Sequence, residues 1–308
     1  MEMYIVGIDV GGTTVKVGKF DLDYNLLDSF EVKTNKDNNG ENILSDVFNA
    51  IKEKMDINEV KGYGFGVPGP VKDNVVYNCV NLGWGTLNVE EAFRKVLNDD
   101  SKVVVIDNDA NVAALGELIN GAAKGARNAI MVTLGTGVGG GIIVNSTLVQ
   151  GAFGGAGEIG HITIDEKYGF MCNCGKKGCL ETISSATGIV RVAKKMMETN
   201  SVESELRNIQ NLTCKDIFDY AKENDELALN VVEEISSYLG KFLSMMAYTT
   251  NPEVIIIGGG VSKAGDILKN TIKKHFDKYV SEKLKETNIV IATLGNDAGI
   301  VGAAGILK

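Results

Sequence analysis

Residues 4–20, YIVGIDVGGTTVKVGKF, contain two apolar, β-branched runs joined by a short glycine-rich turn. The runs are Tyr4–Val10 and Val15–Phe20, and the turn is Gly11-Gly12-Thr13-Thr14. Runs of this composition, bounded by glycine, predict a pair of β-strands. A third such run, Leu26–Val32, follows a polar turn. The chain is therefore predicted to begin as an antiparallel meander.

The same pattern recurs near the middle of the chain. Ala129–Leu134 is a predicted strand, 135–141 a glycine-rich turn, and Ile142–Val144 a second strand. Helical and strand-like segments alternate after each copy. The sequence thus predicts an internal duplication and two α/β domains. The boundaries follow the repeat: residues 1–118, joined by a C-terminal helix in 297–308, form a small domain, and residues 119–296 form a large one.

Further elements follow from hydrophobic periodicity and turn signals. Strands are predicted at Tyr63–Val67, Val103–Ile106, Val254–Ile257 and Ile289–Leu294, and helices at Ile43–Met55, Val89–Leu97, Asn111–Ile119, Leu227–Tyr248 and Ala298–Leu307. The second histidine, His275, lies in a charged helical stretch and is expected on the surface.

Composition excludes several classes of protein. The net charge is −9 without any basic block, which disfavours a nucleic-acid partner. No apolar run approaches the roughly 20 residues that cross a bilayer, and the first residues lack the basic region of a signal peptide. We therefore expect a cytoplasmic protein without a membrane partner. The five cysteines, three of them clustered, fit a reducing compartment and a metal site better than a disulfide framework.

The clustered cysteines form the motif Cys172-x-Cys174-Gly-x-x-Gly-Cys179, with His161 eleven residues upstream of the first. One His and three Cys fill all four positions of a tetrahedral zinc, which leaves no open position for a reactive water. The alternative is buried free thiols, the interpretation we give to Cys79 and Cys214. The spacing favours a structural zinc.

Three glycine-rich turns are candidate phosphate sites. Asp9 stands at the end of a strand, where a carboxylate orients hydrated Mg²⁺ while Gly11, Gly12 and Thr13 let phosphate approach the backbone. The alternative is a plain hairpin with glycines at positive φ. The stretch 134–141 formally contains the dinucleotide fingerprint, but a strand follows it instead of a helix, which favours a phosphate-binding hairpin over a Rossmann site. The third turn, 258–260, precedes a helix and is either a nucleotide contact or a tight turn.

Polar residues mark a second candidate site. Asp109 follows a buried strand and opens a helix, so it is either an N-cap or a general base at the carboxyl end of a strand. Asn81 stands near the only tryptophan, Trp84, in a loop that either binds a hydroxyl-rich sugar or merely packs. Glu158 and Glu181 flank the cysteine motif. Isolated glutamates are usually solvated, but two beside a structural metal suggest a site.

Together these motifs resemble the ROK family of sugar kinases and repressors, within the actin-like ATPase superfamily. The resemblance runs from Asp9–Thr13 through Pro68-Gly69-Pro70, 81–84, 108–111, 134–141 and Glu158-x-Gly-His161 to the cysteine motif and 258–260. It is greatest to the bacterial glucokinases of that family. One departure is Thr14, since many members carry lysine there, and no phosphate role is assigned to a lysine.

The resemblance implies an α/β fold of two actin-like (ribonuclease H-like) domains with mixed sheets and a cleft between them. It implies transfer of the ATP γ-phosphoryl group to the 6-hydroxyl of glucose, with Asp109 as base. It also implies sugar binding by Gly69, Asn81, Asn108, Asp109, Glu158, His161 and Glu181, and binding of ATP and Mg²⁺ by Asp9, Gly11, Gly12, Thr13, Gly135, Thr136, Gly137, Gly139, Gly259 and Gly260. The structural zinc would be held by His161, Cys172, Cys174 and Cys179. A homodimer or tetramer is implied as the assembly. The alternatives are a kinase for N-acylmannosamine, fructose or allose, and a sugar-sensing regulator.

Overall fold

The computed structural model describes residues 3–77 and 79–308. Its first sheet has the strand order β3-β2-β1-β4-β8, formed by β3 (Leu26–Lys33), β2 (Thr14–Phe20), β1 (Tyr4–Val10), β4 (Val60–Val67) and β8 (Val103–Asn108). The first three strands are antiparallel and the last two continue parallel to β1. The helices α2 (Ile43–Lys54) and α3 (Val89–Leu97) share the hydrophobic core of this sheet. We call this unit the small lobe.

The second sheet repeats the arrangement of the first. Its order is β11-β10-β9-β12-β13, formed by β11 (Thr147–Leu148), β10 (Val138–Val144), β9 (Ala129–Leu134), β12 (Val254–Gly258) and β13 (Asn288–Ile291). Again the first three strands are antiparallel, and the last two are parallel to the opening strand of the copy. Order and direction match strand for strand, which confirms the predicted repeat and the mixed sheets of the fold.

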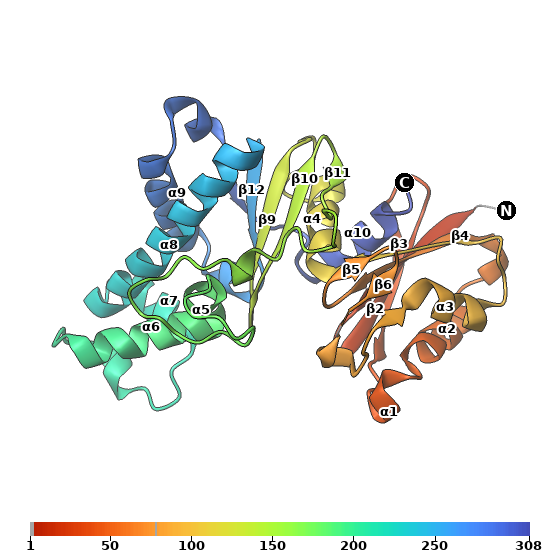
Figure 1. Cartoon of the computed structure of the whole chain (residues 1–308), viewed down its shortest axis with the longest axis horizontal. Coiled ribbons are helices and arrows are strands. Elements are labelled where there is room, and N and C mark those ends of the chain that lie inside the picture. The colour runs from red at the N-terminus through yellow and green to blue at the C-terminus, as the bar shows by residue number, and fades with distance from the viewer. Residues whose placement is uncertain (1–2, 78) are drawn as a thin grey trace.

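The second sheet carries a larger helical layer on the side away from the small lobe (Figure 1). The layer consists of α6 (Ala186–Thr199), α7 (Cys214–Lys222), α8 (Glu226–Thr250) and α9 (Asp266–Tyr279). Apolar residues on one stripe of α8, among them Val231, Ile235 and Leu239, are buried in the core shared with β9 and β12. We call this unit the large lobe.

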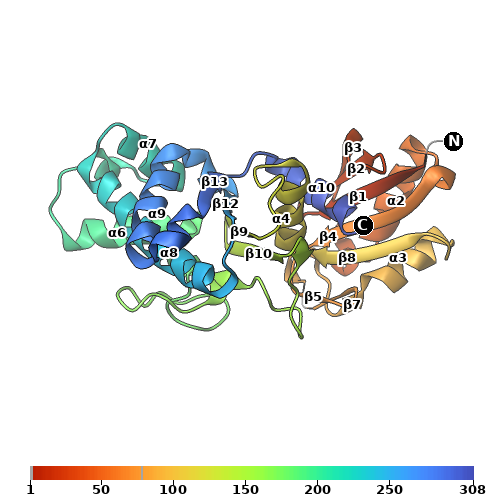
Figure 2. The ribbon, with the colours of Figure 1, turned by 90° about the horizontal axis from the view of Figure 1, so that it is seen from above.

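Two helices lie between the sheets, α4 (Asp109–Asn120) and α10 (Ala298–Gly305) (Figure 2). Both helices carry glycine at the point where they cross. A Cβ on Gly302 would lie 1.6 Å from the carbonyl oxygen of Val112, and one on Gly116 would lie 2.1 Å from that of Ala298. Backbone therefore packs on backbone. Because α10 packs on the first sheet and α4 on the second, this contact joins the two lobes.

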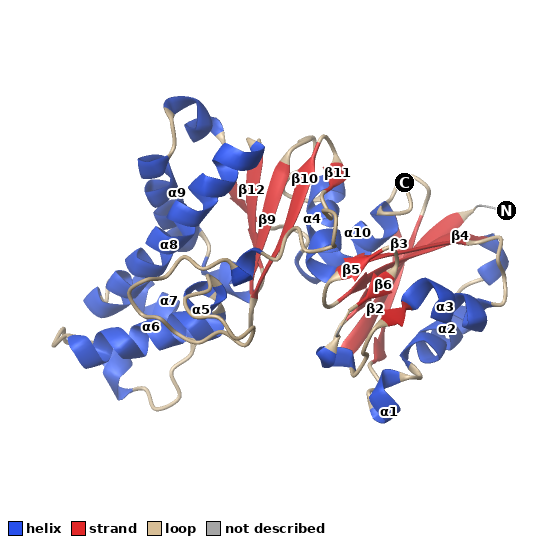
Figure 3. Cartoon of the chain, in the orientation of Figure 1, coloured by secondary structure: helices blue, strands red, loops and turns tan. Residues whose placement is uncertain are grey.

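Short elements complete the chain (Figure 3). They are the helices α1 (Asp37–Gly40) and α5 (Glu181–Ser184), the small sheet of β5 (Val71–Lys72), β6 (Val75–Val76) and β7 (Leu87–Asn88), and the 3-10 turns at Ile57–Glu59, Val80–Leu82, Ile159–His161, Glu205–Asn208, Gly260–Ala264, Glu282–Glu286 and Gly295–Asp297. Among the described residues, none of the helices combines the length and the apolar character that a membrane span requires.

Three expectations from the sequence are wrong. The strand predicted at Ile289–Leu294 ends at Ile291. The glycine-rich stretch 135–141 is not all turn, because β10 begins at Val138 and its glycines pair with β9 in the sheet. His275 is buried, with 6% of its surface exposed, under Gly240 of α8. Burial lowers the pKa of the imidazole, against the pull of Glu233, whose carboxylate lies 3.0 Å from Nε2. The residues next to His275 in the sequence are charged, and they do not indicate that Gly240 on α8 leaves room for its side chain in the interior.

Candidate active site

A cavity of about 910 Å³ lies between the lobes and is lined from both sheets. Because the two copies of the fold face each other, both glycine hairpins open into the same space. Twelve of the residues singled out in the sequence line it: Asp9, Gly11, Gly12, Thr13, Asn81, Asp109, Gly135, Gly137, Gly139, Glu181, Gly259 and Gly260. The ends of β1, β8, β9 and β12 thus meet at one cleft.

Five other candidate residues do not line the cavity itself: Gly69, Thr136, Asn108, Glu158 and His161. Two of them bind each other, since the Asn108 side-chain amide donates to the carbonyl oxygen of Gly69 at 2.9 Å. The carbonyl of Thr136 accepts the hydroxyl of Thr187 at 3.4 Å. Glu158 stands close enough to the cavity to affect the ionisation of Asp109. These residues therefore lie around the cavity and do not form its wall.

Asp109 is the first residue of α4, directly after β8. Asn108 is the N-cap, because its side-chain oxygen accepts the N–H groups of Ala110 and Asn111 at 2.9 and 3.2 Å. The N-cap alternative for Asp109 is thus not realised, although one carboxylate oxygen accepts the N–H of Ala110 at 2.8 Å. The carboxylate is left facing the cavity.

Solvent still reaches the Asp109 side chain through the open cleft. Desolvation by the surrounding walls nevertheless raises its pKa to about 6; the N–H of Ala110 opposes this shift and the charge of Glu158 adds to it. A carboxylate with such a pKa is mostly ionised at neutral pH but is a better proton acceptor than an ordinary aspartate.

Asp9 stands opposite, at the end of β1. Burial, with the charge of Asp109 second, raises its pKa to about 7, while Lys16 on the paired strand acts in the other direction. The amine of Lys16 is itself bound by Asp297. A Cβ on Gly299 would lie 2.2 Å from the Asp9 carboxylate, so a larger residue at this position of α10 would displace that carboxylate. Two acids with raised pKa values in one cleft are typical of a site that receives a cation or a proton.

Glu181 connects the cavity to the cysteine motif. One carboxylate oxygen accepts the N–H of Val138 at 3.1 Å, at the start of β10. The other lies 3.7 Å from Sγ of Cys172. A displacement of the cysteine loop would therefore also move the glycine hairpin of the large lobe.

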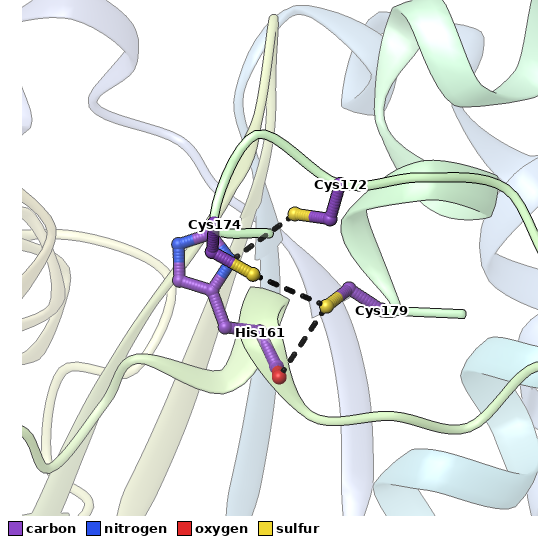
Figure 4. A group of neighbouring side chains, drawn as sticks. All are labelled: His161, Cys172, Cys174 and Cys179. Atoms are coloured by element: carbon purple, nitrogen blue, oxygen red, sulfur yellow. Dashed lines mark hydrogen bonds between the residues drawn. The ribbon is translucent and has the colours of Figure 1, made fainter. Parts of the chain in front are cut away.

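The four predicted zinc ligands lie together (Figure 4). Their donor atoms are all within 4.8 Å of one another. Nδ1 of His161 is 3.5 Å from Sγ of Cys172, and the Sγ atoms of Cys174 and Cys179 are 3.6 Å apart. Zinc–ligand bonds of about 2.0–2.3 Å at tetrahedral angles require separations of about 3.5–3.8 Å, so this donor set fits zinc. Nε2 of His161 points the other way, 4.0 Å from Glu158.

The cavity also contains residues that the sequence did not single out. Lys36 comes from the loop after β3, Lys263 and Ser262 from the turn after β12, and Thr293 and Asn296 from the segment before α10. None belongs to a glycine-rich or acidic motif, so only the fold brings them to the site. Asp107, at the end of β8 beside Asn108, is buried and accepts the side-chain amides of Asn111 and Gln150 at 2.8 and 2.7 Å. Its position just before Asn108-Asp109 was the only signal available.

Comparisons with known proteins agree with this geometry. The model of the ROK family matches residues 5–308. The chain is 42% identical to a glucokinase of Halalkalibacterium halodurans, covering 100% of this chain and 96% of that protein, and 33% identical to a glucokinase of Thermotoga maritima, covering 100% and 98%. A crystal structure of a ROK family glucokinase from Streptomyces griseus in complex with glucose and AMPPNP is 32% identical, with a TM-score of 0.78 and 98% of each chain covered. The repeated sheets, the shared cleft and these similarities over the full length lead to one conclusion: the chain belongs to the ROK family and has its actin-like ATPase fold.

Proposed function

We propose that this protein is a glucokinase that transfers the γ-phosphoryl group of ATP to the 6-hydroxyl of glucose. The observation that carries the proposal is the position of Asp109, which shares one cavity with both glycine hairpins and with Glu181. Phosphoryl transfer to a sugar requires a base, turns that can bind phosphate, and polar side chains that can bind the sugar. The relatives named glucokinase, and the related structure that holds glucose and AMPPNP, support the choice of sugar and donor.

We assign the general base to Asp109, which takes the proton of the sugar hydroxyl as the phosphoryl group arrives. Phosphoryl transfer has a loose transition state, so most of the acceleration comes from positioning and from neutralisation of charge. The sugar would be held by Asn81 and Glu181 in the cavity and by the surrounding Gly69, Asn108, Glu158 and His161. The glycines in the rest of the wall carry no side chain, so phosphate oxygens can approach the backbone closely there.

Two metals complete the proposal. Mg²⁺ neutralises phosphate charge when bound, and Asp9 is the carboxylate placed to orient its hydration shell. Zinc at His161, Cys172, Cys174 and Cys179 would be structural, because the protein supplies all four ligands. His161 contributes Nδ1 to this cluster and turns Nε2 toward Glu158. It is thereby suited to link the cysteine loop to the sugar.

We divide the chain into a small domain, 1–118 with the helix in 297–308, and a large domain, 119–296. The two crossings between the lobes then lie at the ends of α4 and α10. Closure around the sugar would exclude water from the transferred group. Solution scattering with and without glucose tests this: we expect a smaller radius of gyration with sugar, and an unchanged radius would contradict closure.

The decisive experiment is a coupled assay of the purified protein with ATP and a panel of hexoses. We expect the highest kcat/KM for glucose. A preference for N-acylmannosamine, fructose or allose would assign a different ROK kinase activity, and absence of turnover with saturable sugar binding would assign a regulator. We also propose a cytoplasmic, glycolytic homodimer, or a tetramer built from it, which light scattering of the purified protein tests.

A further inference from the structure

The loop after β3 brings a lysine into the active-site cavity. Lys36 lines the cavity, and its Nζ lies 3.5 Å from the point that a Cβ on Gly12 would occupy. The carbonyl oxygen of Asn81 is 3.6 Å from the same point. The amine is therefore above the glycine turn of β1 and on the side where the loop of Asn81 lies.

This position is fixed by the turn itself. The N–H of Thr34 donates to the carbonyl of Thr13 at 3.0 Å, and its hydroxyl donates to the carbonyl of Gly11 at 2.7 Å. Thr34 is buried. Because two hydrogen bonds attach the chain to the turn only two residues before Lys36, the base of the lysine side chain cannot move independently of the turn.

The other side of Lys36 is held by an unusual backbone segment at α1 (Figure 1). Asn38, Asn39 and Gly40 have φ of 50°, 59° and 70°, a left-handed turn that asparagine and glycine adopt more readily than other residues. The turn is held by Trp84, whose Nε1 donates to the carbonyl of Gly40 at 3.0 Å. Gly83 packs on it as well, because a Cβ there would lie 2.9 Å from Cα of Asn39. Strain maintained by neighbouring residues is typical of functional loops.

The charges that line the cavity favour a cation beside the turn of β1. Three carboxylates, Asp9, Asp109 and Glu181, line it, whereas Lys36 and Lys263 are the lysines among its described lining residues. Lys16 is occupied by Asp297. No ion pair engages Lys36 within 3–77 and 79–308. Lys263 follows Gly259 and Gly260 in the large lobe, at the turn after β12 that the resemblance assigns to ATP. Of the two lysines that line the cavity, Lys36 is therefore the one beside the turn of β1 and Asn81.

We infer that Lys36 binds the γ-phosphoryl group of the nucleotide and stabilises its charge during transfer. The inference rests on the proposed function, which assigns phosphate to the turn and the sugar to the side of Asn81; the group between them is the one transferred. A lysine amine is a compact charge with three donors, suited to a phosphate oxygen.

The test compares Lys36→Met with Lys36→Arg and with Lys33→Met, a matched change at the exposed end of β3 outside the cavity. Loss of one charge-assisted hydrogen bond predicts that Lys36→Met lowers kcat/KM for ATP roughly 10- to 100-fold. The KM for glucose should change less than about twofold. Lys36→Arg should recover part of the activity, and Lys33→Met should match the unchanged protein.

Calorimetry separates this inference from the proposed function, because it does not need turnover. With the zinc-loaded protein and magnesium, we expect Lys36→Met to weaken ATP binding and to leave ADP binding within about twofold. Equal weakening of both nucleotides, or unchanged ATP binding and kcat/KM, overturns the assignment to the γ-phosphoryl group. If the unchanged protein fails to phosphorylate any sugar yet its ATP affinity still depends on Lys36, the proposed function fails and the phosphate site stands.

Discussion

Glu117 on α4 accepts the backbone N–H of Thr293 at 3.0 Å, although 176 residues separate them in the chain. The same fully buried carboxylate accepts the N–H groups of Leu294 at 2.8 Å and Ala122 at 2.7 Å. Residues 121–128 and 292–297 are the two places where the chain passes between the lobes. One side chain therefore fixes both crossings, and Thr293 also lines the cavity.

We predict that Glu117→Gln destabilises the protein and disturbs nucleotide binding. The amide presents N–H to backbone donors and leaves at least one of them unsatisfied in the interior, at a cost of about 1–3 kcal/mol. The thermal midpoint should fall by several degrees, and the KM for ATP should rise more than that for glucose. Glu253→Gln is the control: its carboxylate also accepts two backbone N–H groups, of Arg127 and Asn128, but it is exposed and binds only one of the two crossings. Equal effects of the two variants on the thermal midpoint and on the KM for ATP would show that the bonds of Glu117 to both crossings have no special role.

Replacement of the proposed base, Asp109, gives a second prediction. Asp109→Asn should lower kcat by about 10²–10⁴ because a positioned base contributes acceleration of this size. The fold should survive, since Asn108 and not Asp109 is the N-cap of α4. Near-normal turnover in a folded Asp109→Asn protein would remove Asp109 from the mechanism.

The same variant should be more heat-stable than the unchanged protein at pH 7.5. The raised pKa of Asp109 means that its ionised form is disfavoured by folding, with burial as the main cause and Glu158 adding repulsion. The stability associated with its proton is present below pH about 4 and is lost as the pH rises through about 6. The gain from asparagine should therefore shrink at pH 5. Differential scanning fluorimetry at the two pH values measures it, and an equal midpoint difference at both would contradict the titration.

Activity should follow the same ionisation. With Asp109 near a pKa of about 6, kcat/KM for glucose should rise about tenfold per pH unit below 6 and level off above it, because only the carboxylate accepts a proton. Saturating ATP and magnesium keep the ionisation of Asp9 from contributing. A rate that stays constant down to pH 4.5 would indicate a base with an ordinary pKa.

The cysteine cluster predicts one zinc per chain by elemental analysis. Cys174→Ser or prolonged chelation should lower the thermal midpoint and raise the KM for glucose, because Glu181 and His161 connect the cluster to the cavity. The KM for ATP should change less. Cys214→Ala, which removes a thiol remote from the cluster on α7, should leave the metal content unchanged. Fully active protein without zinc would exclude the structural role.

The helix crossing offers a test of packing. Gly302→Ala places a methyl group 1.6 Å from the carbonyl of Val112, so α4 and α10 must separate, and we expect poor folding or a loss of several kcal/mol. Gly85→Ala adds the same group where no atom lies within 4 Å. Its thermal midpoint should stay within about one degree. Similar behaviour of the two variants would contradict the close contact.

Local chemistry was sufficient to predict much of this protein from its sequence. Hairpin turns and apolar periodicity are properties of short segments, so the repeated strand–turn–strand units and helices such as Val89–Leu97 were predictable. The spacing of Cys172, Cys174 and Cys179 was equally local, and its donor atoms converge in the structure.

Tertiary structure decided what depends on residues far apart in the chain. The burial of His275 required a glycine on another helix, and the role of Glu117 required two chain crossings to meet. The start of β10 inside the glycine stretch followed from pairing with β9, because ladder hydrogen bonds compensate the low strand propensity of glycine. The entry of Lys36 into the cavity followed from the attachment of Thr34 to the first turn. A sequence window carries its own propensities and periodicity, whereas close packing between distant segments is fixed only when the whole chain has folded.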